Sequence, residues 1–403
     1  MRATLSPAFT GSKMRQMFDL TSECAEDVVK HFLSKVKSGE RINAEMKEFA
    51  TRYTNDVIAT CAFGLKINSF SNPDNDFYKN GISLLTYRGW WDVVKSIAKV
   101  SIAKITRVFK PKIVDETITN WFKSSILDTM TKRREKNIVR PDMINILMQL
   151  REGSLTHQTD DSKDENVAHD EFAVVEESEL GKMKVTRKWS ENELIAQCFI
   201  FFLAGMEVSS WAITFVVYEL IVNPDIQQKL YEEIVAVNDG LDGKRITYDL
   251  IQKMKFLDQV VSETLRKWPI VLETERMCTK DYVYDDGEKK FMIEKGSSII
   301  YPIYAIQRDP KYFPNPDIFD PTRFSDANKH NILPGSYAPF GIGPRSCIAS
   351  RFALMEIKVM LYYLLLNFSL EPNKNTQIPL KMKRTIAMVT EKGVHLELKP
   401  RKI

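Results

Sequence analysis

The sequence predicts a mainly α-helical protein that carries small β-sheets. Apolar residues recur at helical spacing through much of the chain, as Met14, Met17 and Phe18 do near its start. Residues 194–222 form one apolar run that is far longer than a β-strand. Alternating β-branched and aromatic residues between turn signals gather in one stretch, residues 279–301. We therefore expect helices to dominate and the sheets to be local additions.

Composition narrows the class of protein. The 403 residues are 44% hydrophobic and 27% charged, which is a globular composition with ample apolar material for a core. The net charge of +4 is too small for a typical nucleic-acid binder, although it permits a locally basic docking face. Five cysteines are scattered without close pairs, so the sequence predicts neither a disulfide framework nor a zinc site and indicates a reducing compartment.

The first half of the chain predicts helices separated by polar stretches. Residues 1–62 read as helical. Residues 96–110 intersperse apolar groups with lysines and an arginine, a pattern typical of either a solvated helix face or a segment on a membrane surface. Residues 151–189 are polar and rich in acids, so we expect a partly disordered loop there.

A long central helix should follow over residues 190–222. Ser190 is a natural N-cap with Glu193 three residues later, and Asn223 followed by proline is a stop signal. Glu207 lies near the middle of the run, where an acid costs about 2.5–3.5 kcal/mol in a membrane-spanning helix. A buried core helix is therefore expected rather than a membrane span. Gly205 at its centre indicates the close approach of a flat or bulky group.

The loop over residues 340–349 is the strongest candidate for chemistry. Cys347 ends a segment that contains two glycines and a proline, and a helical apolar pattern begins directly after it. At a helix N-terminus the dipole and free N–H groups favour a thiolate, and Arg345 adds a positive charge nearby. Such a thiolate suits an axial ligand of haem iron. A buried structural cysteine is the alternative, because free cysteines are commonly buried.

Three further motifs lie between the long helix and the cysteine loop or beyond it. Glu263 and Arg266 lie on one helix face and could be an exposed pair worth a few tenths of a kcal/mol. The strands are expected at residues 279–284, 290–293 and 297–301. A final hairpin is expected around residues 390–393.

Together these motifs carry a family resemblance. Phe-Gly-x-Gly-Pro-Arg-x-Cys-Ile at residues 340–348, Glu-x-x-Arg at 263–266 and Pro-x-Arg-Phe at 321–324 occur in the order found in cytochrome P-450 monooxygenases. The start of the chain is similar to insect microsomal members. The resemblance covers nearly the whole chain and implies one cytochrome P-450 domain over residues 1–403. It also implies that the N-terminal membrane anchor, the first strands and the B–C region are lacking.

The resemblance implies haem b as cofactor, with Cys347 as the axial ligand of the iron. It places Phe340, Gly341 and Arg345 in the loop around the ligand, and Arg2 and Arg276 at the haem propionates. Ala204 and Gly205 would face the haem from the central helix. Glu263 and Arg266 would form a buried cluster with Arg323 that supports the cysteine loop. Residues 386–389 would lie against the substrate pocket.

The family usually carries an acid followed by threonine in the central helix, which deliver protons to bound oxygen. Glu207 matches the acid, but Val208 stands where the threonine is expected and provides no hydroxyl. Ser209 lies about 100° further round the helix and is an imperfect substitute. We therefore expect turnover that leaks peroxide, with Ser209 or water covering part of the role.

The resemblance further implies a reaction and partners. The enzyme would insert one oxygen atom from O2 into apolar small molecules, either xenobiotics or lipophilic endogenous compounds. Electrons would come from an NADPH–cytochrome P-450 reductase, with cytochrome b5 as an optional donor, at the cytoplasmic face of the endoplasmic reticulum membrane. Arg345, Arg351 and Lys358 are candidates for the cationic docking face. Two alternatives stay open: a reductase-independent haem-thiolate isomerase or dehydratase, and a non-catalytic fragment that does not hold haem.

Overall fold

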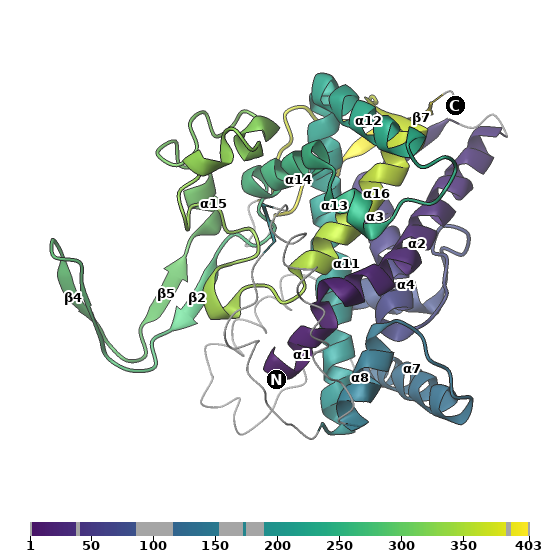
Figure 1. The fold of residues 1–403 in the computed structure, drawn as a ribbon, viewed down its shortest axis with the longest axis horizontal. Coiled ribbons are helices and arrows are strands. Elements are labelled where there is room, and N and C mark those ends of the chain that lie inside the picture. The colour runs from purple at the N-terminus through teal and green to yellow at the C-terminus, as the bar shows by residue number, and fades with distance from the viewer. Residues whose placement is uncertain are drawn as a thin grey trace.

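The computed structural model describes residues 2–37, 41–85, 116–152, 172–174, 189–383 and 388–401. Helices make up most of this part of the chain (Figure 1). The α-helices are α1 (Arg2–Leu5), α2 (Gly11–Lys37), α3 (Met46–Phe63), α4 (Asp76–Leu85), α7 (Glu116–Glu135), α8 (Met143–Glu152), α11 (Glu191–Val222), α12 (Pro224–Asp239), α13 (Tyr248–Gln252), α14 (Lys255–Lys267), α15 (Ile303–Gln307) and α16 (Ser350–Asn367). Short 3-10 helices are η1 (Ser6–Phe9), η2 (Pro321–Phe324), η3 (Lys329–Asn331) and η4 (Gly343–Arg345).

The strands form small antiparallel sheets, as predicted. They are β1 (Ile42–Glu45), β2 (Thr274–Met277), β3 (Tyr282–Asp285), β4 (Lys290–Ile293), β5 (Ser298–Tyr301), β6 (Phe368–Pro372) and β7 (His395–Pro400). One sheet has the order β1-β7-β6, while β2 pairs with β5 and β3 pairs with β4. The β3–β4 hairpin projects from the helical body at the end of the β2–β5 ribbon (Figure 1). The mainly α prediction with small sheets is therefore confirmed.

Helix α11 is the core of the helical body. Its 32 residues begin with the predicted capping box, in which the Ser190 hydroxyl accepts from the Glu193 N–H and the Glu193 carboxylate accepts from the Ser190 N–H. Among the described helices, only α11 is long and apolar enough to cross a membrane, but 61% of its most apolar stretch is buried inside the protein. The prediction of a buried core helix is confirmed.

Helix α11 packs chiefly against α3 and also against α16 and α14. The Thr54 hydroxyl of α3 donates to the Met206 carbonyl oxygen at 2.9 Å, so the two helices are joined by a polar contact as well as by apolar packing. Helix α16 continues directly from the cysteine loop and packs against α2 as well as α11. The loop is therefore anchored to the most deeply buried part of the fold.

Some local expectations differ from the structure. Residues 1–62 include strand β1, because Ile42 pairs with Leu398 of β7, a partner far along the chain that local periodicity does not reveal. Strand β2 at Thr274–Met277 lies before the predicted β-rich stretch and pairs with β5. The predicted basic segment 96–110, most of the polar loop 151–189 and residues 386–387 lie outside the described residues.

Candidate active site

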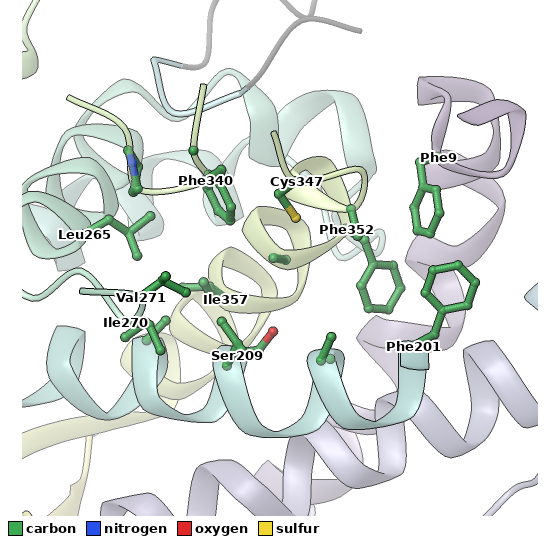
Figure 2. A pocket seen from close by; sticks show the side chains of 18 of the residues that line it. Phe9, Phe201, Ser209, Leu265, Ile270, Val271, Phe340, Cys347, Phe352 and Ile357 are labelled. Atoms are coloured by element: carbon green, nitrogen blue, oxygen red, sulfur yellow. The ribbon is translucent and has the colours of Figure 1, made fainter. Parts of the chain in front are cut away.

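A cavity of about 330 Å³ lies between α11, α16, the cysteine loop and the segment after α14. This volume falls in the range usual for small-molecule and cofactor sites. Its lining is largely apolar, and Figure 2 shows side chains that point into it from every side, among them Phe9, Phe201, Leu265, Ile270 and Phe352. A cavity with this lining favours apolar ligands.

Cys347 contributes its sulfur to the cavity wall, on the side opposite Ser209 of α11 (Figure 2). The Cys347 N–H donates to the Phe340 carbonyl oxygen at 2.8 Å, which closes the loop. Gly341 and Gly343 both have a φ of 73°, in the left-handed region that favours glycine. Phe340 and Gly341 also line the cavity. The tight turn therefore requires its two glycines, and it directs the Cys347 sulfur into the cavity.

The protonation of the Cys347 thiol differs from the prediction. Helix α16 begins only at Ser350, so the cysteine lies outside the helix N-terminus. Burial raises the pKa of the free Cys347 thiol, and this effect outweighs the lowering by the Ala349 N–H and by the Arg2 guanidinium. The expectation that the helix dipole and Arg345 would favour a thiolate is wrong for the free thiol, because burial dominates and Arg2 provides the nearby charge.

Three arginines border the cavity and its loop. Arg276 and Arg345 line the cavity and have exposed side chains. Arg2 donates from Nη1 to the Ser346 carbonyl oxygen at 2.6 Å. Its buried Nε has no hydrogen-bond partner among the described residues. The structure thus brings Arg276 and Arg345 to the cavity and Arg2 to the cysteine loop, where one buried donor of Arg2 stays free.

Helix α11 forms the opposite wall through Ala204, Gly205, Val208 and Ser209. A Cβ on Gly205, however, would meet the Ile58 side chain of α3, with Cγ1 only 2.9 Å away. The close approach that the mid-helix glycine predicted therefore includes the packing of α3 on α11. Gly205 and Ile58 both line the cavity as well.

Glu207 does not contribute to the cavity lining. One carboxylate oxygen pairs with the Lys47 Nζ at 2.8 Å, and the other accepts from the Trp211 indole N–H at 2.8 Å. The carboxylate is therefore held toward α3, while Val208 and Ser209 face the cavity. Lys47 lies far away in the sequence, and no local signal could have identified it as the partner.

The structure brings Glu263, Arg266 and Arg323 together. Arg266 donates from Nε and Nη2 to the two Glu263 oxygens at 2.7 and 2.9 Å, and Arg323 Nε lies 3.5 Å from the same carboxylate. Glu263 also accepts from the Asp320 N–H at 3.0 Å, and Arg266 donates to the Gln307 carbonyl oxygen at 2.9 Å. Burial raises the pKa of Glu263, and the Arg266 hydrogen bonds oppose the rise. The cluster ties α14 to the segments before the cysteine loop.

Two residues of α16 differ from expectation. Lys358 is fully buried and donates to Asp258 at 2.9 Å, so it cannot belong to a cationic docking surface. Glu356 is equally buried. It belongs to the sequence signature that continues from the cysteine loop, but no role was predicted for it.

The comparison with protein families decides the identity. The cytochrome P-450 family model matches residues 1–398. The chain belongs to the cytochrome P-450 family. It is 43% identical to the probable cytochrome P-450 9f2 of Drosophila melanogaster over 98% of this chain and 72% of that protein. It is 39% identical to cytochrome P-450 9e2 of Blattella germanica over 100% of this chain and 74% of that protein.

The cofactor of a cytochrome P-450 is haem b, a flat and mostly apolar ring system that carries carboxylates. The residues of this chain fit that group. The cavity is apolar, a cysteine sulfur lies in its wall, and Arg276 and Arg345 offer cations to carboxylates. The free Nε of Arg2 is a further donor without a protein partner among the described residues.

Family membership also defines the class of reaction, because cytochromes P-450 are monooxygenases and therefore oxidoreductases. The described residues contain no group of three His, Cys, Asp or Glu side chains that could hold an ion. All five cysteines are free thiols.

Proposed function

We propose that Cys347 is the axial thiolate ligand of the haem iron and that the enzyme oxidises apolar small molecules, either xenobiotics or lipophilic endogenous compounds. One observation carries the proposal: the Cys347 sulfur lies in the wall of an apolar cavity, opposite helix α11 (Figure 2). Haem b, when bound, supplies the activation of O2, and a thiolate ligand favours O–O cleavage. Metal binding would itself deprotonate the thiol that burial otherwise keeps neutral.

The other cavity residues have roles that follow from their chemistry. Arg2, Arg276 and Arg345 would bind the carboxylates of the cofactor through charge-assisted hydrogen bonds. Ala204 and Val208 present small side chains, so they would leave room for substrate beside α11. The aromatic and aliphatic lining would exclude water and select apolar substrates, because burying a polar group without a partner is costly.

The electron supply belongs to the same proposal. An NADPH–cytochrome P-450 reductase would deliver electrons, with cytochrome b5 as an optional donor, on the cytoplasmic face of the endoplasmic reticulum. The names of the relatives support the monooxygenase class and leave these partners to experiment. Arg345 and Arg351 stay candidates for a cationic docking face, since Arg345 is exposed and Arg351 half-buried.

The test is Cys347→Ser, with Cys278→Ser as the matched control because Cys278 does not line the cavity. The purified wild-type protein, supplied with haem, should give the red-shifted reduced-CO band of thiolate ligation. Cys278→Ser should keep this band, and Cys347→Ser should lose it completely. A Cys347→Ser protein that keeps the band would overturn the ligand assignment. A haem-bound protein that oxidises no apolar probe with NADPH and reductase would favour the isomerase or dehydratase alternative.

A further inference from the structure

Residues 172–174 lie between α8 and α11 in the sequence, and they pack against the segments that surround the cysteine loop. Phe172 is half-buried, Ala173 is 3% exposed and belongs to the core, and Val174 packs against the core. We call these three residues the anchor segment. They are not among the residues that line the cavity, so any effect on the reaction has to pass through other side chains.

The Phe172 ring completes a cluster of three aromatic side chains. Its centroid lies 5.0 Å from that of Phe324 and 5.4 Å from that of Tyr337, and the Phe324 and Tyr337 centroids are 4.9 Å apart. The rings meet at interplanar angles of 69°, 51° and 56°, so they are tilted or edge to face, as aromatic pairs prefer. Without the Phe172 ring, the other two rings would lose one side of their packing.

Tyr337 begins the segment that leads into the cysteine loop. Its hydroxyl donates to a backbone carbonyl oxygen of α14 at 3.0 Å, and the Ala338 N–H donates to the Gln307 side chain at 2.8 Å. Two residues further on, the Phe340 carbonyl oxygen accepts from the Cys347 N–H at 2.8 Å. The position of Tyr337 is therefore passed along a short, hydrogen-bonded stretch to the turn that holds the sulfur.

The backbone of the anchor segment is joined to the other flank of the loop. The Phe172 N–H donates to one Asp258 oxygen at 3.2 Å, and the buried Lys358 ammonium donates to the other at 2.9 Å. Lys358 belongs to α16, the helix that continues from the loop. A buried ion pair holds its partners in place, because either charge alone would be costly in the interior. The anchor segment is thus joined to the chain before Cys347 through its ring and to the chain after it through Asp258.

We propose that the anchor segment is a positioning element for the cysteine ligand. It clamps Tyr337 on one side of Cys347 and the Asp258–Lys358 pair on the other, and so keeps the loop in the turn that directs the sulfur into the cavity. Phe172 is a positioning residue, since it acts through Tyr337 and Asp258. The proposal rests on the proposed function, because it assumes that Cys347 binds the haem iron.

Hydrogen exchange of the purified full chain tests the clamp itself. Phe172→Ala removes two aromatic contacts, which corresponds to roughly a ten-fold gain in opening of the loop, so the backbone amides of residues 337–347 should exchange faster. Phe70→Ala is the matched control, because Phe70 is also half-buried but packs on Phe32 and Phe49 of α2 and α3, with centroids 5.5 and 5.4 Å away. It should leave exchange over residues 337–347 unchanged. Wild-type exchange in Phe172→Ala would overturn the proposal.

The reduced-CO band tests whether the clamp acts on the ligand. In haem-supplied protein, Phe172→Ala should lose the red-shifted band several-fold faster than the wild type in denaturant too dilute to unfold the chain. Phe172→Tyr keeps the ring, and its hydroxyl can stay in solvent because the side chain is half-buried, so the band should last as long as in the wild type. Equal acceleration in Phe70→Ala and Phe172→Ala would mean that general destabilisation causes the loss and would refute the positioning role.

The two proposals fail in distinguishable ways. A wild-type protein without the thiolate band contradicts the proposed function, and the exchange experiment still decides whether the anchor segment holds the loop. A wild type that shows the band, together with a Phe172→Ala protein that matches it in exchange and in band lifetime, contradicts the positioning element alone.

Discussion

Two fully buried glutamates belong to helices that line the active-site cavity, and they lie in two different surroundings. Glu263 of α14 is bound by Arg266, by Arg323 and by the Asp320 N–H. Glu356 of α16 has no hydrogen-bond partner for its carboxyl group among the described residues. Both side chains have 0% exposure, so burial alone does not distinguish them.

The difference lies in the hydrogen-bond and charge partners of the two carboxyl groups. Burial raises the pKa of both acids, but hydrogen bonds and ion pairs from two arginines oppose the rise at Glu263. A charge that is held by two cations fixes the segments that carry them, because every member of such a network constrains the others. A neutral acid without partners adds no such constraint. We infer that the first carboxyl group fixes the segments around it and that the second does not.

The largest expected effect comes from breaking the first network. Arg266→Leu removes the double hydrogen bond to Glu263 and leaves that carboxylate buried without its main partner. We expect a loss of about 3–5 kcal/mol in the free energy of unfolding, the range for breaking a buried ion pair. The segments before the cysteine loop should loosen as well, so the haem content of the purified protein should fall sharply. Chemical denaturation and absorbance measure the two quantities.

The matched change at the second site is Glu356→Gln, which should not lower the free energy of unfolding at pH 7 and should preserve the haem content, because the wild-type acid must bind a proton on folding at that pH whereas the amide need not. It replaces a neutral acid by a neutral amide of similar shape, so no buried charge is left alone. Equal losses in Arg266→Leu and Glu356→Gln would contradict the distinction between the two glutamates.

The stability of the folded protein should depend on pH through Glu356. The folded pKa of Glu356, about 8, lies above its unfolded value of 4.5, so the folded state binds more protons between these values. The stabilisation by the bound proton is complete below pH 4.5 and is lost as the pH rises toward 8. Relative to Glu356→Gln, the wild type should lose about 1.4 kcal/mol of stability for each pH unit within this window.

The comparison with Glu356→Gln isolates this slope from other groups. Asp56, for example, has a pKa raised by burial to about 6 and adds its own slope in both proteins. Denaturation midpoints at several pH values for the two proteins give the difference. A constant difference between pH 5 and pH 8 would mean that Glu356 has an ordinary pKa, because an ionised acid in both states contributes no slope.

The sequence predicted the parts of this comparison that depend on local signals or on family motifs. The long helix α11 followed from Ser190, Glu193 and the stop at Asn223, all of which act within one turn of the helix ends. The cluster of Glu263, Arg266 and Arg323 followed from the resemblance, because these positions belong to motifs that the family shares. The tight turn before Cys347 was visible in its glycines.

The parts that the sequence could not predict depend on distant partners. Nothing near Glu207 indicates that Lys47 binds its carboxylate, and nothing near Gly205 indicates that Ile58 fills the space beside it. Strand β1 was missed because its partner β7 lies at the other end of the chain. Glu356 was given no role for the reverse reason: its carboxyl group lacks a partner among the described residues, which only the packed structure reveals.

Val208→Thr should have the smallest effect on stability of these substitutions. Valine and threonine have the same shape, and a threonine hydroxyl in a helix can bond to the carbonyl oxygen one turn earlier, so stability should change by less than about 1 kcal/mol. The new hydroxyl would stand beside Ser209 on the cavity wall. It can carry a proton onward but is too weak an acid to supply one at neutral pH.

Val208→Thr should therefore lower the share of reduced oxygen released as hydrogen peroxide, and Val208→Ala, which also lacks a hydroxyl, should not lower it. Peroxide release and NADPH consumption are measured for the wild type and both variants. An unchanged peroxide share in Val208→Thr would show that the missing hydroxyl does not cause the leak, because the two side chains differ in little else.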